Sequence, residues 1–460
     1  MATTLLVVMV ILAVLALRSS SGISAPRAGP LLTGPAGDPL AYRPGSDASL
    51  ARRAAAGTAQ VLFTKSPGGV LATAARVAGW RPLIDAAVRG TDIPPAMLEG
   101  IVFLESAGRA DAVAGGSVTD AAGLTQILPG TAQSLLGMHV DLARSEQLFA
   151  ELQRAQATGR STRANRLRQQ LARADARFDP AAALAGAVHY LEMAERVLGR
   201  LDLAVVAYHA GIGNVQTVLD DYDGGRAVSY EQLFFGTGPD DHATAWSFLS
   251  GLGDDASLYL WRVLEAEHIM RLYRAAPAEL RRLTAQETGY PSNALTLVPE
   301  ASVQRFRSPQ ALSAAYQSGE LVSLPRDPAR LHLRYARSMG ALAHRLGVPA
   351  GLYRGLRPSA LTALIQMAAL VHRLAGGSLS VVSTVLDARY QQQLGYSDPP
   401  GTTGFTFLLS NHFTSPAQAQ AFQFVLGRLQ SLDLLAYIQG STTTEVTVAP
   451  DAGRVLHSGI

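Results

Sequence analysis

The sequence contains no cysteine among its 460 residues. The chain therefore cannot form disulfides, bind a metal through thiolates, use a cysteine nucleophile or carry the lipid of a lipoprotein anchor. A protein without cysteine can fold in oxidising and in reducing surroundings, so this absence leaves the compartment open.

Charged residues are also sparse, at 16% of the chain, and the formal net charge is only +3. Lys65 is the single lysine among 39 basic residues, and no dense basic block with interleaved aromatic residues occurs. We therefore expect no nucleic-acid partner. The hydrophobic content of 48% is typical of a globular protein, and the length predicts two or three domains.

The amino-terminal region begins with an uninterrupted apolar run from Leu5 to Leu17. This run suits a signal-peptide core better than a spanning helix of roughly 20 residues. No basic residue precedes it and Arg18 follows it, which departs from the usual pattern. We expect residues 1–25 to be a signal peptide or a membrane anchor. Residues 26–71, rich in Gly, Pro, Ala and Ser, are expected to be a flexible linker.

A helix that ends in a carboxylate is predicted after Pro94. Leu98, Ile101, Val102 and Glu105 follow one another at the spacing of one buried helix face. A carboxylate beside apolar groups resists ionisation, so we expect a raised pKa for Glu105. A raised pKa suits a general acid that works near neutral pH.

The surrounding region, residues 72–275, has helical periodicity throughout. Its polar stretch at 141–179 carries leucines at helical spacings and is expected to be an inserted helical hairpin. Asp179 and Pro180 then predict a new helix start, with Asp179 as the N-cap. The sequence therefore predicts a mainly α domain over this range.

Three motifs occur in order within this domain. They are Glu-Ser at 105–106, GLTQILPGTA at 123–132 and AYHAGIGNV at 207–215. Together they resemble the soluble lytic transglycosylase family, whose lysozyme-like domain carries Glu-Ser, Gly-Leu-Met-Gln and Ala-Tyr-Asn-Ala-Gly motifs in this order. The resemblance covers about residues 72–275.

The resemblance assigns roles to individual residues. Glu105 matches the sole catalytic acid/base, and Gln126 matches the glutamine of the cleft. Tyr208 matches the tyrosine that helps to hold the N-acetylated sugar. His209 stands where the family has asparagine, so a hydrogen bond to substrate there has a different geometry and pH dependence. Ser117 is the residue that could supply a polar contact from the loop.

The implied substrate is the glycan strand of peptidoglycan, and the implied location is the cell envelope. The implied reaction is cleavage of the MurNAc-GlcNAc β-1,4 bond with formation of 1,6-anhydroMurNAc ends, without a metal or other cofactor. Glycosidases with two carboxylates work differently, but Asp111 and Asp120 are better interpreted as turn and capping residues. Two alternatives stay open, namely a hydrolytic muramidase and a non-catalytic peptidoglycan-binding scaffold.

The carboxy-terminal part is predicted to be separate. Residues 276–328 are punctuated by prolines and are expected to be a linker, and residues 329–460 alternate between helical and β-like patterns, which indicates a smaller α+β domain.

This second domain resembles, more faintly, the zinc D-alanyl-D-alanine carboxypeptidase family over about residues 356–452. The family's metal-ligand positions fall on Gly401, Leu408 and Glu445, and its arginine position falls on Leu386. Catalytic zinc needs about three protein ligands, so the resemblance implies a domain without metal and without catalysis. We expect it either to bind the stem peptide or to brace the protein.

Overall fold

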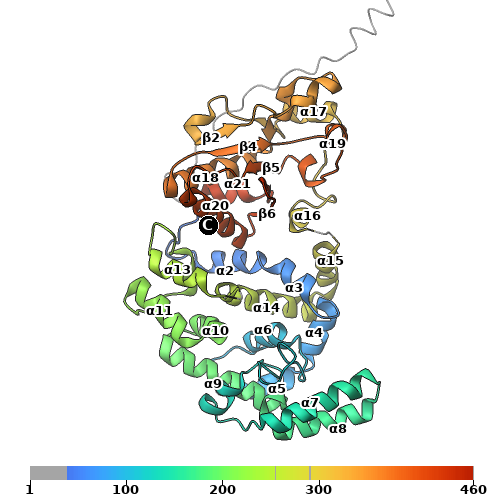
Figure 1. Ribbon diagram of the computed structural model, residues 1–460, viewed down its shortest axis with the longest axis vertical. Helices are drawn as coiled ribbons and strands as arrows, with labels where there is room; N and C mark the ends of the chain where they lie inside the picture. Colours follow the sequence, from blue (N-terminus) through green and yellow to red (C-terminus); the bar gives the residue numbers. More distant parts are fainter. Residues whose placement is uncertain (1–38, 254, 290–291, 459–460) are drawn as a thin grey trace, which may run out of the picture. The chain divides into compact units, whose positions relative to one another are not determined.

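The computed structural model describes residues 39–253, 255–289 and 292–458 (Figure 1). The predicted signal peptide or anchor at 1–25 lies outside these residues. No helix among the described residues combines the length and the apolarity that crossing a bilayer requires.

The chain divides into two compact units. The helical unit comprises residues 39–296 together with Leu426–Leu434, and the sheet unit comprises Leu297–Val425 and Leu435–Ser458. In chain order the longer helices of the helical unit are α2 (Asp47–Ala56), α3 (Ala59–Lys65), α4 (Val70–Ala78), α5 (Arg81–Ala87), α6 (Pro95–Ser106), α7 (Leu142–Ala157), α8 (Ser161–Ala174), α9 (Pro180–Leu198), α10 (Leu201–Ala210), α11 (Ile212–Asp223), α12 (Tyr230–Phe235), α13 (Ala243–Gly251), α14 (Tyr259–Ala275) and α15 (Pro277–Thr288).

The flexible linker predicted over residues 26–71 is wrong for its second half. Residues 47–56 and 59–65 form helices α2 and α3, with Leu50 and Leu62 buried. Helix α2 packs against α14. Alanine-rich helices contain few large apolar residues, so their periodicity is weak in the sequence although their small side chains pack closely.

Helices α6 and α14 pack closely against each other. A Cβ atom added at Gly100 of α6 would lie 2.8 Å from the backbone oxygen of Val263 on α14. The missing side chain thus lets the two helix backbones approach closely. Glu99, the neighbour of Gly100, is fully buried and accepts hydrogen bonds from Arg274 Nη1 at 2.8 and 2.9 Å.

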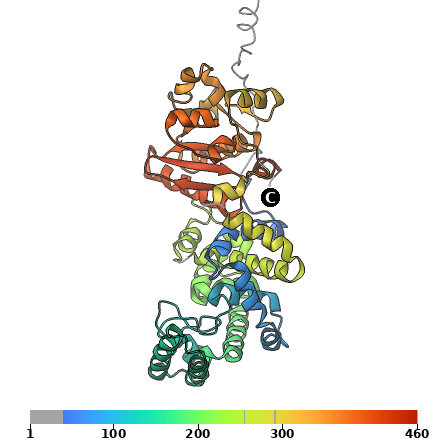
Figure 2. The same cartoon turned by 90° about the vertical axis from the view of Figure 1, so that its right-hand side faces the viewer.

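The insertion forms a hairpin of α7 and α8, which lie side by side in Figures 1 and 2. Its neck is closed by two backbone hydrogen bonds, from Asp141 N to Ala174 O and from Ala176 N to His139 O, each 2.9 Å long. Helix α9 then begins as predicted, because the Asp179 carboxylate accepts hydrogen bonds from two amides of its first turn.

The linker predicted over 276–328 is also helical in large part. It contains α15, α16 (Asn293–Leu297) and α17 (Pro309–Ser318). Pro277 and Pro309 occupy the first turns of α15 and α17, where a proline costs no hydrogen bond. These prolines therefore mark helix starts, whereas their density suggested a linker.

The sheet unit contains a five-stranded sheet in the order β2-β4-β5-β7-β6. Strands β2 and β4 are parallel and the remaining pairs are antiparallel. A two-stranded sheet of β1 and β3 accompanies it. The strands are β1 (Val322–Ser323), β2 (Leu333–Tyr335), β3 (Gly355–Leu356), β4 (Leu379–Ser383), β5 (Thr406–Ser410), β6 (Leu435–Gln439) and β7 (Thr443–Val448). The helices are α18 (Pro358–Ala375), α19 (Ala388–Leu394), α21 (Ala452–Ser458) and the part of α20 (Pro416–Ser431) that ends at Val425.

Candidate active site

Glu105 lies in the last turn of α6 and is half-buried. The helix ends at Ala107, which adopts a left-handed conformation with φ of 53°. The Ala107 carbonyl accepts a hydrogen bond from Arg76 Nε at 2.8 Å, and the Gly108 carbonyl accepts one from Trp80 Nε1 at 2.9 Å. Two side chains therefore fix the backbone directly after the carboxylate.

Tyr259, the first residue of α14, holds the Glu105 carboxylate. Its hydroxyl donates a hydrogen bond to Glu105 Oε1 over 2.6 Å. Burial raises the pKa of Tyr259 well above its ordinary value, and the charge of Glu105 raises it further. The hydroxyl consequently stays protonated and stays a donor at physiological pH.

The helical periodicity of residues 72–275 includes this helix, but Tyr259 was not among the predicted site residues. A usable signal was present, since a tyrosine that opens an apolar helix is buried and its hydroxyl then needs a partner.

Tyr208 and His209, at the end of α10, form an aromatic cluster with this tyrosine. The Tyr208 ring is nearly parallel to that of Tyr259, with centroids 6.5 Å apart, and the His209 ring stacks on Tyr259 at 4.9 Å. The Tyr208 hydroxyl donates to the Thr125 carbonyl over 2.8 Å. Burial, followed by the charge of Glu105, raises the pKa of Tyr208. The third motif therefore contacts the second motif directly, and it contacts the tyrosine that is hydrogen-bonded to Glu105.

Gln126 lies in the loop, next to the Thr125 carbonyl. It has a left-handed backbone with φ of 48°. Its side-chain Nε2 donates hydrogen bonds to the carbonyls of Gly123, at 2.8 Å, and Ala112, at 3.2 Å. The amide group thus closes the loop upon itself.

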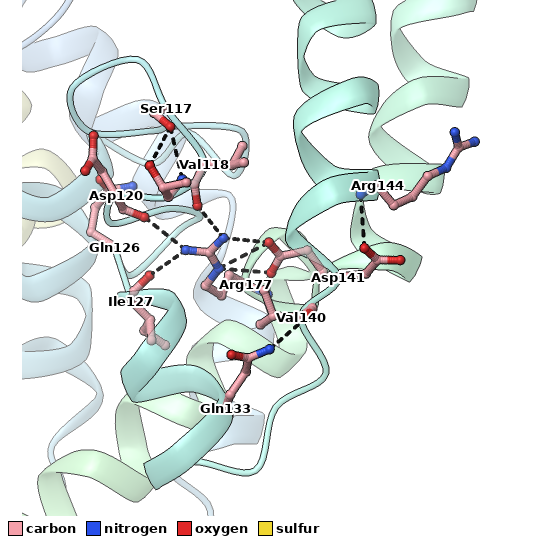
Figure 3. A network of polar contacts seen from close by, with 12 residues as sticks. Ser117, Val118, Asp120, Gln126, Ile127, Gln133, Val140, Asp141, Arg144 and Arg177 are labelled. Atoms are coloured by element: carbon pink, nitrogen blue, oxygen red, sulfur yellow. Dashed lines mark hydrogen bonds and ion pairs between the residues drawn. The ribbon is translucent and has the colours of Figure 1, made fainter.

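Ser117 lies in a turn of the same loop (Figure 3). Its hydroxyl is 2.6 Å from that of Thr119 and accepts a hydrogen bond from the Thr119 amide at 3.2 Å. These contacts stabilise the turn.

Asp111 is engaged away from Glu105. Its Oδ2 accepts hydrogen bonds from Arg168 Nε and from Gln156 Nε2, both at 2.9 Å. The carboxylate therefore joins the loop to the hairpin of α7 and α8. These contacts stabilise the position of the loop.

Residues 154–227 match the family model of the transglycosylase SLT domain. The match supports the resemblance to the lytic transglycosylase family. It supports, at a general level, a glycosidase-like enzyme that acts on peptidoglycan in the cell envelope. The matched segment contains Tyr208 and His209, whereas Glu105 and Gln126 precede it. No curated protein matches the chain.

Two of the four positions named from the carboxypeptidase resemblance, Leu408 and Glu445, lie on neighbouring strands, whereas Gly401 lies in a short 3₁₀ turn and Leu386 in the segment between β4 and α19. Leu408 of β5 lies directly opposite Glu445 of β7. Burial, followed by the charge of Asp398, raises the pKa of Glu445 to about 7. Gly401 donates its amide hydrogen to Asp398 Oδ2 at 3.1 Å. Among the described residues, no three His, Asp or Glu side chains are grouped so that they could hold a metal ion.

Proposed function

We propose that the chain is a lytic transglycosylase that cleaves the MurNAc-GlcNAc β-1,4 bond of peptidoglycan, with Glu105 as its single acid/base. The observation that carries this proposal is the 2.6 Å hydrogen bond to the Glu105 carboxylate from the hydroxyl of Tyr259, which belongs to the aromatic cluster. A carboxyl group held by a permanent donor has a fixed orientation, which proton transfer to a bound sugar requires.

The proposed reaction uses Glu105 twice. The protonated carboxyl donates its proton to the oxygen that leaves with GlcNAc, and the bond between MurNAc C1 and that oxygen breaks. The N-acetyl oxygen of MurNAc stabilises the positive charge that develops at C1. The Glu105 carboxylate then takes the proton of the C6 hydroxyl while O6 bonds to C1. The acid is regenerated, water is not consumed, and no cofactor is needed.

The contacts of Asp111 favour this reaction over hydrolysis with two carboxylates. A hydrolase of that kind places its second carboxylate about 5–10 Å from the acid, facing the sugar. The Asp111 carboxylate instead pairs with Arg168 over 2.9 Å. With one acid, the nucleophile is supplied most simply by the substrate.

The remaining site residues have supporting roles in the proposal. His209 is exposed at the end of α10 and is proposed to contact the sugar. Tyr208 and Gln126 are proposed to line the sugar-binding surface. The Tyr208 hydroxyl is hydrogen-bonded to the carbonyl of Thr125, the residue before Gln126, and this contact joins the two. Ser117 is proposed to offer a polar contact from the loop.

The test is digestion of purified peptidoglycan, followed by mass spectrometry of the product ends. We expect 1,6-anhydro ends. Reducing ends would identify a muramidase, and a folded protein that binds without cutting would identify a scaffold. Glu105→Gln should lower turnover by roughly a thousandfold or more while glycan binding persists. Glu146→Gln, an exposed position on α7, is the matched control and should cut at the wild-type rate.

The proposal also includes the outer parts of the chain. Peptidoglycan lies outside the cytoplasmic membrane, so residues 1–25 are proposed to direct export and either to be removed or to stay as an anchor. A fusion of these residues to a reporter enzyme, followed by cell fractionation, tests this. The sheet unit is proposed to lack catalysis and to bind stem peptide or brace the chain; release of D-alanine from stem peptide by the purified protein would contradict the first part.

A further inference from the structure

Arg177 has a fully buried guanidinium, in the short 3₁₀ turn between α8 and α9. The Asp175 carboxylate, also fully buried, accepts hydrogen bonds from Arg177 Nη2 at 2.7 Å and from Arg177 Nε at 3.0 and 3.2 Å. Burying a charged pair away from water is costly unless its remaining donors are satisfied. The partners of the remaining N–H donors of Arg177 therefore indicate the role of this ion pair.

These donors all reach the backbone of the loop that carries Ser117 and Gln126 (Figure 3). Arg177 Nη2 donates to Val118 O at 2.7 Å, and Nη1 donates to Asp120 O at 3.0 Å and to Ile127 O at 3.3 Å. One planar guanidinium thus fixes three points of the loop backbone. A lysine ammonium carries the same charge but lacks this fork geometry.

The loop also touches the backbone of Arg177 itself. A Cβ atom added at Gly123 would lie only 1.7 Å from the Arg177 carbonyl oxygen, and Gly123 has φ of 83°. The Gly123 carbonyl accepts the shorter of the two hydrogen bonds from the Gln126 side chain. Gly123 therefore links the position of Gln126 to the backbone of Arg177.

The hairpin of α7 and α8 supports the same loop from its apolar side. Val118 and Ala122 of the loop are buried in one cluster with Leu148 and Leu152 of α7 and Leu167 of α8. The Asp111–Arg168 pair ties the start of the loop to the hairpin. The hairpin is consequently packed against the loop and is more than a solvated insertion.

We propose that Arg177, locked by Asp175, is a positioning residue for glycan binding, and that the hairpin insertion is part of the device that holds the loop at residues 111–127 against the glycan. Arg177 acts through the loop and does not touch the substrate. The proposal rests on the proposed function, since it assumes that the loop lines a glycan-binding cleft.

The test compares steady-state constants of the full-length Arg177→Lys variant with the wild type on soluble glycan strands. Lysine keeps a positive charge beside Asp175, so the fold is expected to persist. We expect KM to rise about tenfold, because the loop shifts, while kcat changes less than about threefold, because Glu105 and Tyr259 lie on other elements. A merely structural role would lower the active fraction, and hence the apparent kcat, at an unchanged KM.

The matched control is Arg163→Lys, which alters an exposed pair with Glu151 in the same hairpin and should leave KM unchanged. A second variant, Asp111→Asn, releases the loop from Arg168 without burying a charge. It should raise KM about threefold, and it decides the matter if Arg177→Lys fails to fold.

The dissociation constant for glycan strands, measured in a Glu105→Gln background, should rise by the same factors as KM. This measurement needs no turnover, so it still tests the positioning role if the wild type proves to bind without cutting. An unchanged KM and an unchanged dissociation constant in the folded variants would overturn the positioning role and leave the transglycosylase proposal standing. Absence of cleavage by the wild type would overturn the latter alone.

Discussion

Two buried carboxylates of the helical unit, Glu99 and Asp175, are both neutralised by arginine, but the arginines differ in their exposure to solvent. Both are fully buried and both pair with arginine. The partners of Glu99 are Arg274, whose side chain is 39% exposed, and Arg81, at 36%. The partner of Asp175 is Arg177, which is 0% exposed. The arginines that pair with Glu99 therefore reach solvent, whereas Arg177 does not.

This difference in exposure follows from the part of the structure that each ion pair stabilises. Glu99 stands next to Gly100, where α6 and α14 already pack closely. Regular helices satisfy their own backbone groups, so this interface does not depend on the ion pairs alone. The loop at 111–127 is held by isolated bridges, such as Ala122 with Ile127, and by hydrogen bonds within its turns. The buried Arg177 adds side-chain donors to the carbonyls of Val118, Asp120 and Ile127.

The largest effect on stability should come from breaking these pairs one at a time. Asp175→Asn leaves the Arg177 charge buried without a counter-charge, and we expect a loss of about 3–5 kcal/mol. Glu99→Gln leaves Arg81 and Arg274, which can turn to water, and we expect a loss of about 1–2 kcal/mol. Urea unfolding of both variants measures the difference in the free energy of unfolding. Equal losses would mean that exposure of the partner arginine does not matter.

A smaller effect, on activity alone, should come from Tyr259→Phe. The variant keeps the ring beside Tyr208 but loses the hydroxyl that orients Glu105. A hydrogen bond to a charged group is worth about 1.5–3 kcal/mol, so kcat should fall by about 10- to 100-fold. The matched control is Tyr190→Phe, which loses a hydroxyl that is hydrogen-bonded to the backbone of Ala207 and Ile212. It should retain turnover within about threefold, and a similar loss in both variants would contradict the orienting role.

A further effect is a pH dependence of stability, which extends the comparison to a third buried carboxylate, Glu265 of α14. Burial, followed by the charge of Glu287, raises the pKa of Glu265 from 4.5 to about 8. Because the pKa is higher in the folded state, the folded state binds more protons than the unfolded state between these values. Stability is therefore greatest below about pH 4.5, with respect to this group, and falls as pH rises to about 8.

The slope from this one group is at most about 1.4 kcal/mol per pH unit. Unfolding midpoints measured from pH 5 to pH 8.5 should decline in the wild type and decline less in Glu265→Gln. The exposed variant Glu146→Gln is the control and should follow the wild type. Parallel curves for Glu265→Gln and the wild type would show that this carboxyl does not titrate as described.

Elements with a strong local pattern could be predicted from the sequence. The apolar spacing before Glu105 predicted α6, and Asp179 with Pro180 predicted the start of α9. Helices α2 and α3 were missed because small residues give a weak periodicity, and the helices of 276–328 were missed because prolines at helix starts resemble linker prolines.

The residues of the candidate site likewise fall into those that a local sequence pattern revealed and those that it did not. The motifs that contain Glu105, Gln126 and Tyr208 were visible because they are contiguous in the chain. The contributions of Tyr259 and Arg177 were not, since each acts on a segment at least 50 residues away. Nothing in the local sequence of either residue states which partner it will meet.

The sequence by itself determined the candidates for the proposed chemistry, that is, one carboxylate at a helix end and the motifs that follow it. The tertiary structure decided how those residues are held. Long-range packing put a tyrosine hydroxyl on Glu105 and a buried guanidinium under the loop of Gln126. The physical reason is that buried polar groups must find partners, and the partners are chosen by the packing of distant elements and not by the neighbours in the chain.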